Sequence, residues 1–186
     1  MKAAEADLLI LPDCGNADDD HWQTRWERKL STARRVVQDD WACPDMSAWV
    51  ERIVEAVGEA ERPVVFLAHG LGIAAMVHAA PNLDPAKLAA GFLVAPVDVE
   101  DGRIPETVDP ALAPLSRDPL PFPSMLVASR SDPACSFETA DDLGHAWGSF
   151  VIDAGDVGHL DSDSGHGPWP EGSLTFARFL SSIRRA

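Results

Sequence analysis

Three positions that could take part in nucleophilic catalysis each follow a predicted strand: Gly70, Asp132 and His159. The turn that holds Asp132 would let its carboxylate accept a hydrogen bond from a histidine ring and fix the tautomer of that ring. His159 follows a flexible glycine and would then act as a general base. Taken singly, Asp132 could cap a turn and His159 could be a surface histidine. Their order along the chain, with Gly70 at the place of a nucleophile, favours a catalytic origin.

The segment around Gly70 has the frame of a nucleophile elbow but no nucleophile. Residues 64–67 form a continuous apolar run typical of a strand buried on both faces, and residues 73–80 favour a helix. Between them lies Ala68-His69-Gly70-Leu71-Gly72, which occupies the place of the G-x-S-x-G pattern. Glycine stands where that pattern has serine, so no hydroxyl is present at the central position.

Strands and helices alternate along the whole chain. Apolar runs predict strands, and helical spacing or capping residues predict helices. The strands are expected at 7–12, 33–38, 64–67, 89–94, 124–129 and 149–153, and the helices at about 20–30, 45–57, 73–80, 136–147 and 170–184. This alternation predicts a single α/β domain over residues 1–186, with a mostly parallel sheet and helices on both of its faces. Loops at the carboxyl ends of such strands form the ligand site.

The stretch 97–123 is rich in proline and predicts a long ordered loop, with a short helix near Ala111. A loop of this length could be a cover over the site or a packing element. The sequence leaves both open.

Composition excludes several classes of partner. The formal net charge is -15, so the surface repels nucleic-acid phosphates and anionic membranes. The three cysteines fit no zinc pattern and indicate free thiols in a reducing compartment. The apolar run near the start is too short for a signal peptide, and no stretch reaches the length of a membrane span. We therefore expect a cytoplasmic protein with no cofactor and no metal.

The chain resembles the small serine-hydrolase family that includes retinoblastoma-binding protein 9, in particular its bacterial members. The resemblance covers nearly the whole length. It lies in Leu11-Pro12, Asn16, His21-Trp22-Gln23, Trp26-Glu27, Gln38-Asp39-Asp40-Trp41, Ala68-His69, Leu71-Gly72, Ala95-Pro96, Pro121-Phe122-Pro123-Ser124, Ser131-Asp132-Pro133, Gly158-His159, Ser164-Gly165 and Gly167-Pro168-Trp169-Pro170. It implies a compact α/β-hydrolase fold with sheet order 2-1-3-4-5-6 and a Ser-His-Asp triad acting on a small ester or amide. Asp132 and His159 carry over, whereas Gly70 replaces the serine.

A second departure from the family pattern lies in the turn after the first strand. The family tends to have glycine where this chain has Asp13, near the backbone donors of the oxyanion hole. We expect that hole at the backbone of Leu71, Asp13 and Cys14. A carboxylate beside it would oppose developing negative charge. Both departures predict a protein that is inactive or very weak as a serine hydrolase, with a protein partner as one role for an inactive form.

An active hydrolase is the alternative. In that case Gly70 is a variant of a serine enzyme, or His159 activates a water. The missing side chain should leave space for such a water, held by His159 and the Leu71 amide. Three weaker hypotheses are a calcium loop at Asp161, Asp163 and Gly165, a thiol nucleophile at Cys14, and a rebuilt site around Ser131.

Overall fold

A computed structural model of the chain describes residues 1–101 and 104–183. Its sheet has six strands in the order β2-β1-β3-β4-β5-β6, and every neighbouring pair is parallel. The strands are β1 (Asp7–Leu11), β2 (Ala33–Arg35), β3 (Val64–Gly70), β4 (Leu88–Pro96), β5 (Ser124–Ala128) and β6 (Phe150–Asp153). The predicted fold class and strand order are confirmed.

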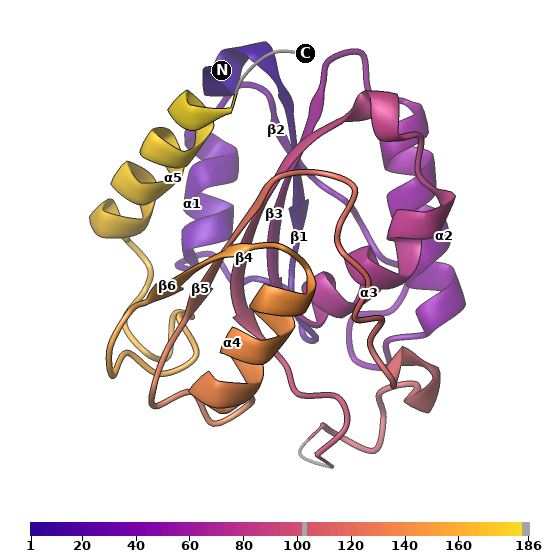
Figure 1. Ribbon diagram of the computed structural model, residues 1–186, viewed down its shortest axis with the longest axis vertical. Coiled ribbons are helices and arrows are strands. Elements are labelled where there is room, and N and C mark those ends of the chain that lie inside the picture. Colours follow the sequence, from indigo (N-terminus) through magenta and orange to yellow (C-terminus); the bar gives the residue numbers. More distant parts are fainter. Residues whose placement is uncertain (102–103, 184–186) are drawn as a thin grey trace.

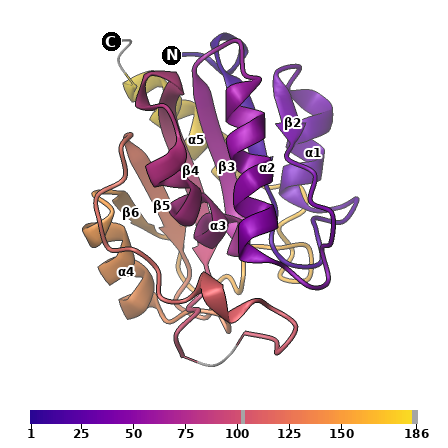
Figure 2. The same cartoon turned by 90° about the vertical axis from the view of Figure 1, so that its right-hand side faces the viewer.

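Within the described residues, five α-helices cover the two faces of this sheet, and Figures 1 and 2 show their arrangement. One face carries α1 (Trp22–Lys29) and α5 (Pro170–Ser182), and the other carries α2 (Met46–Gly58), α3 (Leu71–Ala79) and α4 (Phe137–Ala146). Short 3₁₀-helices lie at Ala3–Glu5, Ala80–Asn82, Pro85–Lys87 and Pro110–Leu112. Among the described residues, no helix is both long enough and apolar enough to cross a membrane.

The continuous apolar runs form strands because the core lies on both sides of the sheet. In β1, Leu8 contributes to the cluster under α1 and α5, whereas Leu9 contributes to the cluster under α2, α3 and α4. Residues of β3 are buried throughout. Alternate side chains of a central strand therefore each gain an apolar environment, which is why these strands show no polar alternation.

One predicted strand ends earlier than expected, and the proline-rich loop takes one of the two roles that the sequence left open. The predicted strand 33–38 stops at Arg35, and Val37 beyond it is largely exposed, because this strand lies at the sheet edge. The proline-rich loop buries Val108, Leu112 and Phe122 in the same cluster as α3. The described part of this loop therefore packs on the core, and the expected short helix is the 3₁₀ turn Pro110–Leu112.

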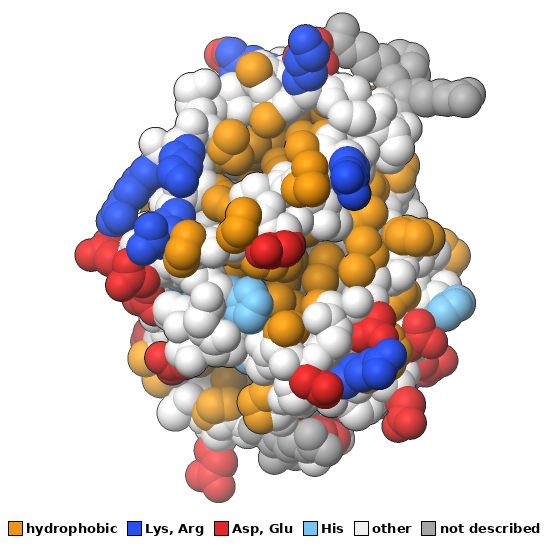
Figure 3. All heavy atoms as spheres, turned by 90° about the vertical axis from the view of Figure 1, so that its left-hand side faces the viewer, with side chains coloured by type: hydrophobic (Ala, Val, Ile, Leu, Met, Phe, Trp, Pro, Cys, Tyr) orange, Lys and Arg blue, Asp and Glu red, His pale blue; other side chains and the backbone are white. Residues whose placement is uncertain are grey.

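The face with α1 and α5 carries an apolar hollow on the surface. Hydrophobic side chains gather over this side of the molecule (Figure 3), where a cavity of about 310 Å³ is lined by Trp26, Leu30, Phe176 and Leu180 among others. It also touches Met1, which lies before β1. The hollow is therefore at the amino ends of the strands, opposite the loops that hold the predicted site.

Candidate active site

The elbow between β3 and α3 has the backbone of a nucleophile turn. Gly70 ends β3 and adopts φ 55° and ψ -128°, and α3 begins at the next residue. Gly72 allows the helix to pass close to the end of β1, since a Cβ there would lie 2.4 Å from the carbonyl oxygen of Leu11. The glycines thus place the Leu71 amide at a helix N-terminus, where it faces outward as an anion-binding donor.

The side chain of Asp13 enters the space that a serine at position 70 would use. A Cβ built on Gly70 would lie 2.1 Å from Cγ of Asp13. The amides of Leu71 and Cys14 both donate to Oδ1 of Asp13, each over 2.7 Å. The sequence placed Asp13 in the oxyanion hole through its backbone, but it is the carboxylate that fills the hole. The prediction of a water in the space beside Gly70 is therefore wrong, because the Asp13 carboxylate occupies that space.

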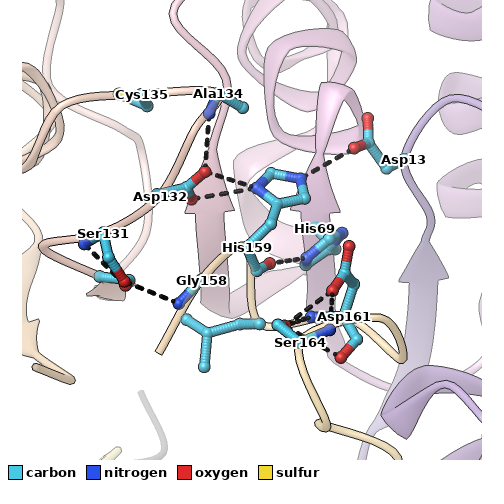
Figure 4. Close-up of polar contacts among 12 residues, drawn as sticks. Asp13, His69, Ser131, Asp132, Ala134, Cys135, Gly158, His159, Asp161 and Ser164 are labelled. Atoms are coloured by element: carbon cyan, nitrogen blue, oxygen red, sulfur yellow. Dashed lines mark hydrogen bonds and ion pairs between the residues drawn. The ribbon is translucent and has the colours of Figure 1, made fainter. Parts of the chain in front are cut away.

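His159 lies between two carboxylates (Figure 4). Its Nδ1 is 2.9 Å and 3.0 Å from the two oxygens of Asp132, and its Nε2 is 3.0 Å from Oδ2 of Asp13. The Ala134 amide donates to Asp132 and holds that carboxylate in place. Carboxylates accept and do not donate when ionised, so a ring that meets one at each nitrogen carries protons on both. The geometry therefore favours an imidazolium.

The contacts within this trio favour the ionised forms of His159 and Asp13, so the pKa of His159 is raised and the pKa of Asp13 is lowered. Burial opposes a charge on His159, but the hydrogen bonds and charges of Asp13 and Asp132 outweigh it and raise the pKa of His159 from 6.5 to about 10. Burial alone would raise the pKa of Asp13, yet the hydrogen bond from His159 and the Leu71 amide help to hold it below 3.8. Both partners are thus charged around neutral pH. Their side chains are 13% (His159) and 22% (Asp13) exposed, so solvent reaches the pair.

Buried polar side chains beneath the trio hold its loops in place. Nε2 of His69 donates to the carbonyl oxygen of His159 over 2.8 Å, and burial, followed by the charge of His159, lowers the pKa of His69 to about 4. Gln23 donates to the carbonyl oxygens of Leu11 and Leu67 and so joins β1 to β3. These roles of His69 and Gln23 were missed. Both belong to the motifs that carry the family resemblance, which was the available signal.

The structure brings together Gly70, Leu71, Asp13, Cys14, His159 and Asp132 at the carboxyl ends of the strands. The three weaker hypotheses find no such support. The Cys14 thiol donates to the Trp41 carbonyl, and burial, with the charge of Asp13, raises its pKa. Ser131 accepts from the Gly158 amide. Asp161 accepts from Ser164 in a local turn.

One group of side chains in the described residues has the spacing of a metal site. Ligand atoms of Asp13, His69 and His159 lie within 4.8 Å of one another. However, Nε2 of His159 already shares a proton with Asp13, and Nε2 of His69 is engaged by a carbonyl oxygen. Metal ligation needs deprotonated nitrogens, so these residues as arranged do not fit a metal ion.

Comparison with known proteins gives the family and the fold. The family model for serine hydrolases matches residues 8–178. A YdeN-like hydrolase from Pectobacterium atrosepticum is 29% identical, with a TM-score of 0.84 over 97% of this chain and 94% of that one. The YdeN protein from B. subtilis is 16% identical, with a TM-score of 0.81 over 95% and 100% of the two chains.

More distant structures share the fold alone. An esterase domain from Rhodothermus marinus is 15% identical, with a TM-score of 0.64 over 96% of this chain and 88% of that one. Comparison with curated proteins gave no match.

Proposed function

Since this chain belongs to the serine hydrolase family, we propose that it keeps the hydrolase fold but no longer transfers acyl groups through a serine. It hydrolyses carboxylic esters and amides weakly or not at all. One observation carries this proposal. The carboxylate of Asp13 fills both the space of the nucleophile and the oxyanion hole. The carbonyl oxygen of a substrate would find no free pair of backbone N–H donors. Position 70 also has no hydroxyl that could attack the carbonyl carbon.

The charge of Asp13 makes the loss deeper than the missing hydroxyl alone. An oxyanion hole works by directing donors at negative charge that develops in the transition state, and removing one donor costs roughly 10²–10³ in rate. Here both amides already bind an anion. A second anion at the same place would be repelled, so any remaining ester hydrolysis should be close to the uncatalysed rate.

Attack by a water that His159 activates is disfavoured for the same reason. A general base needs a free lone pair, and both ring nitrogens of His159 face carboxylates. The raised pKa of His159 keeps the ring protonated at neutral pH. The place where such a water was expected holds Asp13 instead.

The proposal also covers the ligand class, the partner and the location of the protein. The net charge of -15 supports a small neutral or cationic ligand over nucleic acid or an anionic membrane. A small ester or amide, bound without turnover, is the ligand class that family membership supports, with a protein partner as the other role of an inactive form. The free thiols of Cys14 and Cys43 support a cytoplasmic location.

A fluorophosphonate probe tests the proposal, because it labels an activated serine. We expect no labelling of this chain, and hydrolysis of p-nitrophenyl acetate at the same rate as His159→Ala. Labelling, or ester hydrolysis that falls in His159→Ala, would show that serine-type or water-based acyl chemistry persists.

A further inference from the structure

We propose that Asp13 is itself a nucleophile, and that this site hydrolyses small primary alkyl halides through an alkyl ester of Asp13. The inference rests on the proposed loss of serine chemistry at this site and adds a different reaction in its place. It starts from the position of one carboxylate, which lies where the family's serine side chain would lie and is joined to the same histidine.

The two oxygens of Asp13 have different surroundings. Oδ1 accepts from the amides of Leu71 and Cys14, whereas Oδ2 accepts from Nε2 of His159. Oδ2 therefore keeps an unshared lone pair on a side chain that is partly exposed. Carboxylates in proteins do act as covalent nucleophiles. The amides and the imidazolium keep this one ionised.

The filled oxyanion hole selects the kind of electrophile. Attack of a carboxylate on an ester carbonyl would give an anhydride, which is more reactive than the ester, and would need the hole for the substrate oxygen. Attack on a saturated carbon needs no hole, since the carbon–oxygen bond forms as the leaving group departs. The product is a stable alkyl ester. A carboxylate held in this way therefore fits alkyl transfer and not acyl transfer.

The protons on His159 select the leaving group. An alkoxide or an amine must be protonated as it leaves, but both N–H groups of His159 are directed at carboxylates. A halide leaves as a stable anion without a proton. In this first step the Oδ2–carbon bond forms, the carbon–halogen bond breaks, and the electron pair departs with the halide.

Formation of the ester prepares the second step. Alkylated Asp13 is neutral, so His159 loses one of its two anionic partners, becomes less basic and releases its Nε2 proton to solvent. The ring, still held by Asp132, can then take a proton from a water that attacks Cγ of Asp13. The negative charge develops on Oδ1, where the amides of Leu71 and Cys14 already point.

Collapse of this intermediate completes the cycle. The Cγ–Oδ2 bond breaks, and His159 protonates the departing alcohol. Asp13 is left as a carboxylic acid with one oxygen from water, and it passes its proton to Nε2 of His159, which restores the carboxylate and the imidazolium. The sum is alkyl halide plus water giving alcohol, halide and a proton. The first alcohol released carries an oxygen of Asp13, and the water oxygen remains in the protein.

The proposed reaction needs both the Asp13 carboxylate and a glycine at position 70. Any side chain at position 70 would place its Cβ 2.1 Å from Cγ of Asp13. Glycine is thus what allows the carboxylate to reach this position. Loss of a serine alone does not require an acid to be bound in the oxyanion hole.

The test uses ethyl, butyl and hexyl bromide with the full chain, its Asp13→Asn and His159→Gln variants, and Asp163→Asn as a matched control at an exposed acid. We expect continuous bromide release by the unmodified chain and by Asp163→Asn, and release at least about 1,000-fold slower in Asp13→Asn. In His159→Gln we expect one bromide per chain and an alkyl adduct, located on Asp13 by peptide mass mapping. In heavy-oxygen water the unmodified chain should gain one heavy oxygen at Asp13.

Peptide mapping also separates this reaction from direct alkylation of cysteine, which would persist in Asp13→Asn. Absence of an Asp13 adduct in folded His159→Gln with all three bromides, or bromide release that Asp13→Asn leaves unchanged, would overturn the inference. Because the adduct is read on Asp13 itself, poor folding of Asp13→Asn would not obscure the result. Fluorophosphonate labelling would instead show failure of the proposed loss of serine chemistry, so the two failures are distinguishable.

Discussion

Replacing Gly70 by serine should not by itself create a serine hydrolase, although it would supply the missing residue of a Ser-His-Asp triad. The new Cβ would lie 2.1 Å from Cγ of Asp13, where ordinary contacts begin at 3.4 Å. The carboxylate would have to move by more than about 1 Å, a shift larger than packed interiors absorb without loss of contacts. Removal of Asp13 together with the addition of serine, in Asp13→Gly/Gly70→Ser, should relieve this clash.

The cost of the single change can be worked from the contacts of Asp13. The displaced carboxylate would lose its two bonds from the amides of Leu71 and Cys14. Hydrogen bonds to charged groups contribute about 1.5–3 kcal/mol each. Loss of two of them would lower the free energy of unfolding by about 3–6 kcal/mol, against a typical total of about 5–15 kcal/mol.

The assay is fluorophosphonate labelling together with p-nitrophenyl acetate hydrolysis, on the unmodified chain, both single variants and the double variant. We expect labelling of the double variant alone, and ester hydrolysis at least about 10³-fold faster than in the unmodified chain, since a base, a nucleophile and two free donors are all restored. Asp13→Gly clears the hole without a nucleophile and should stay unlabelled. Equal labelling of Gly70→Ser and the double variant would refute the claim that Asp13 blocks the site, as would a folded double variant that is not labelled.

Three further predictions concern stability and are each measured by urea denaturation. Gly72→Ala should lower the free energy of unfolding by several kcal/mol, because its Cβ would lie 2.4 Å from a backbone oxygen of β1, whereas Gly58→Ala meets nothing within 4 Å and should be neutral or stabilising by up to about 1 kcal/mol. Gln23→Leu should lower the free energy of unfolding by about 2–3 kcal/mol, because two buried carbonyl oxygens, one at the end of β1 and one in the middle of β3, lose their donor. The pKa of His159 is raised on folding, so its contribution is complete below pH 6.5 and disappears as the pH rises through about 10, at up to about 1.4 kcal/mol per pH unit. This decline should be largely absent in Asp13→Asn, and an unchanged slope there would argue against the ion pair.

The sequence predicted most of the fold because the signals were local and strong. Short, β-branched apolar runs such as 64–67 are typical of strands buried on both faces, and alternation with helices then limits the topology. Asp132 and His159 were predicted as partners because both follow strands that end at the same edge of the sheet. That topology places their two loops side by side, and the structure brings the two side chains to 2.9 Å.

The orientation of Asp13 could not be predicted in the same way. Its position near the oxyanion hole follows from strand order, but the direction of a turn side chain depends on which space is free. That space exists only because Gly70 has no side chain, and the two residues are 57 positions apart in a contact that no local pattern records. The charge state of His159 was missed for the same reason, since it needs both carboxylates to be placed.

The most direct test of the account is the titration of His159 by NMR, followed through the ring resonances of the unmodified chain and assigned by their loss in His159→Gln. We expect an imidazolium that stays protonated on both nitrogens at pH 8 and titrates near pH 10, with the pKa lowered in Asp13→Asn. A His159 ring that titrates near pH 6.5, and does so equally in Asp13→Asn, would contradict the claim that the Asp13 carboxylate occupies the place of the nucleophile.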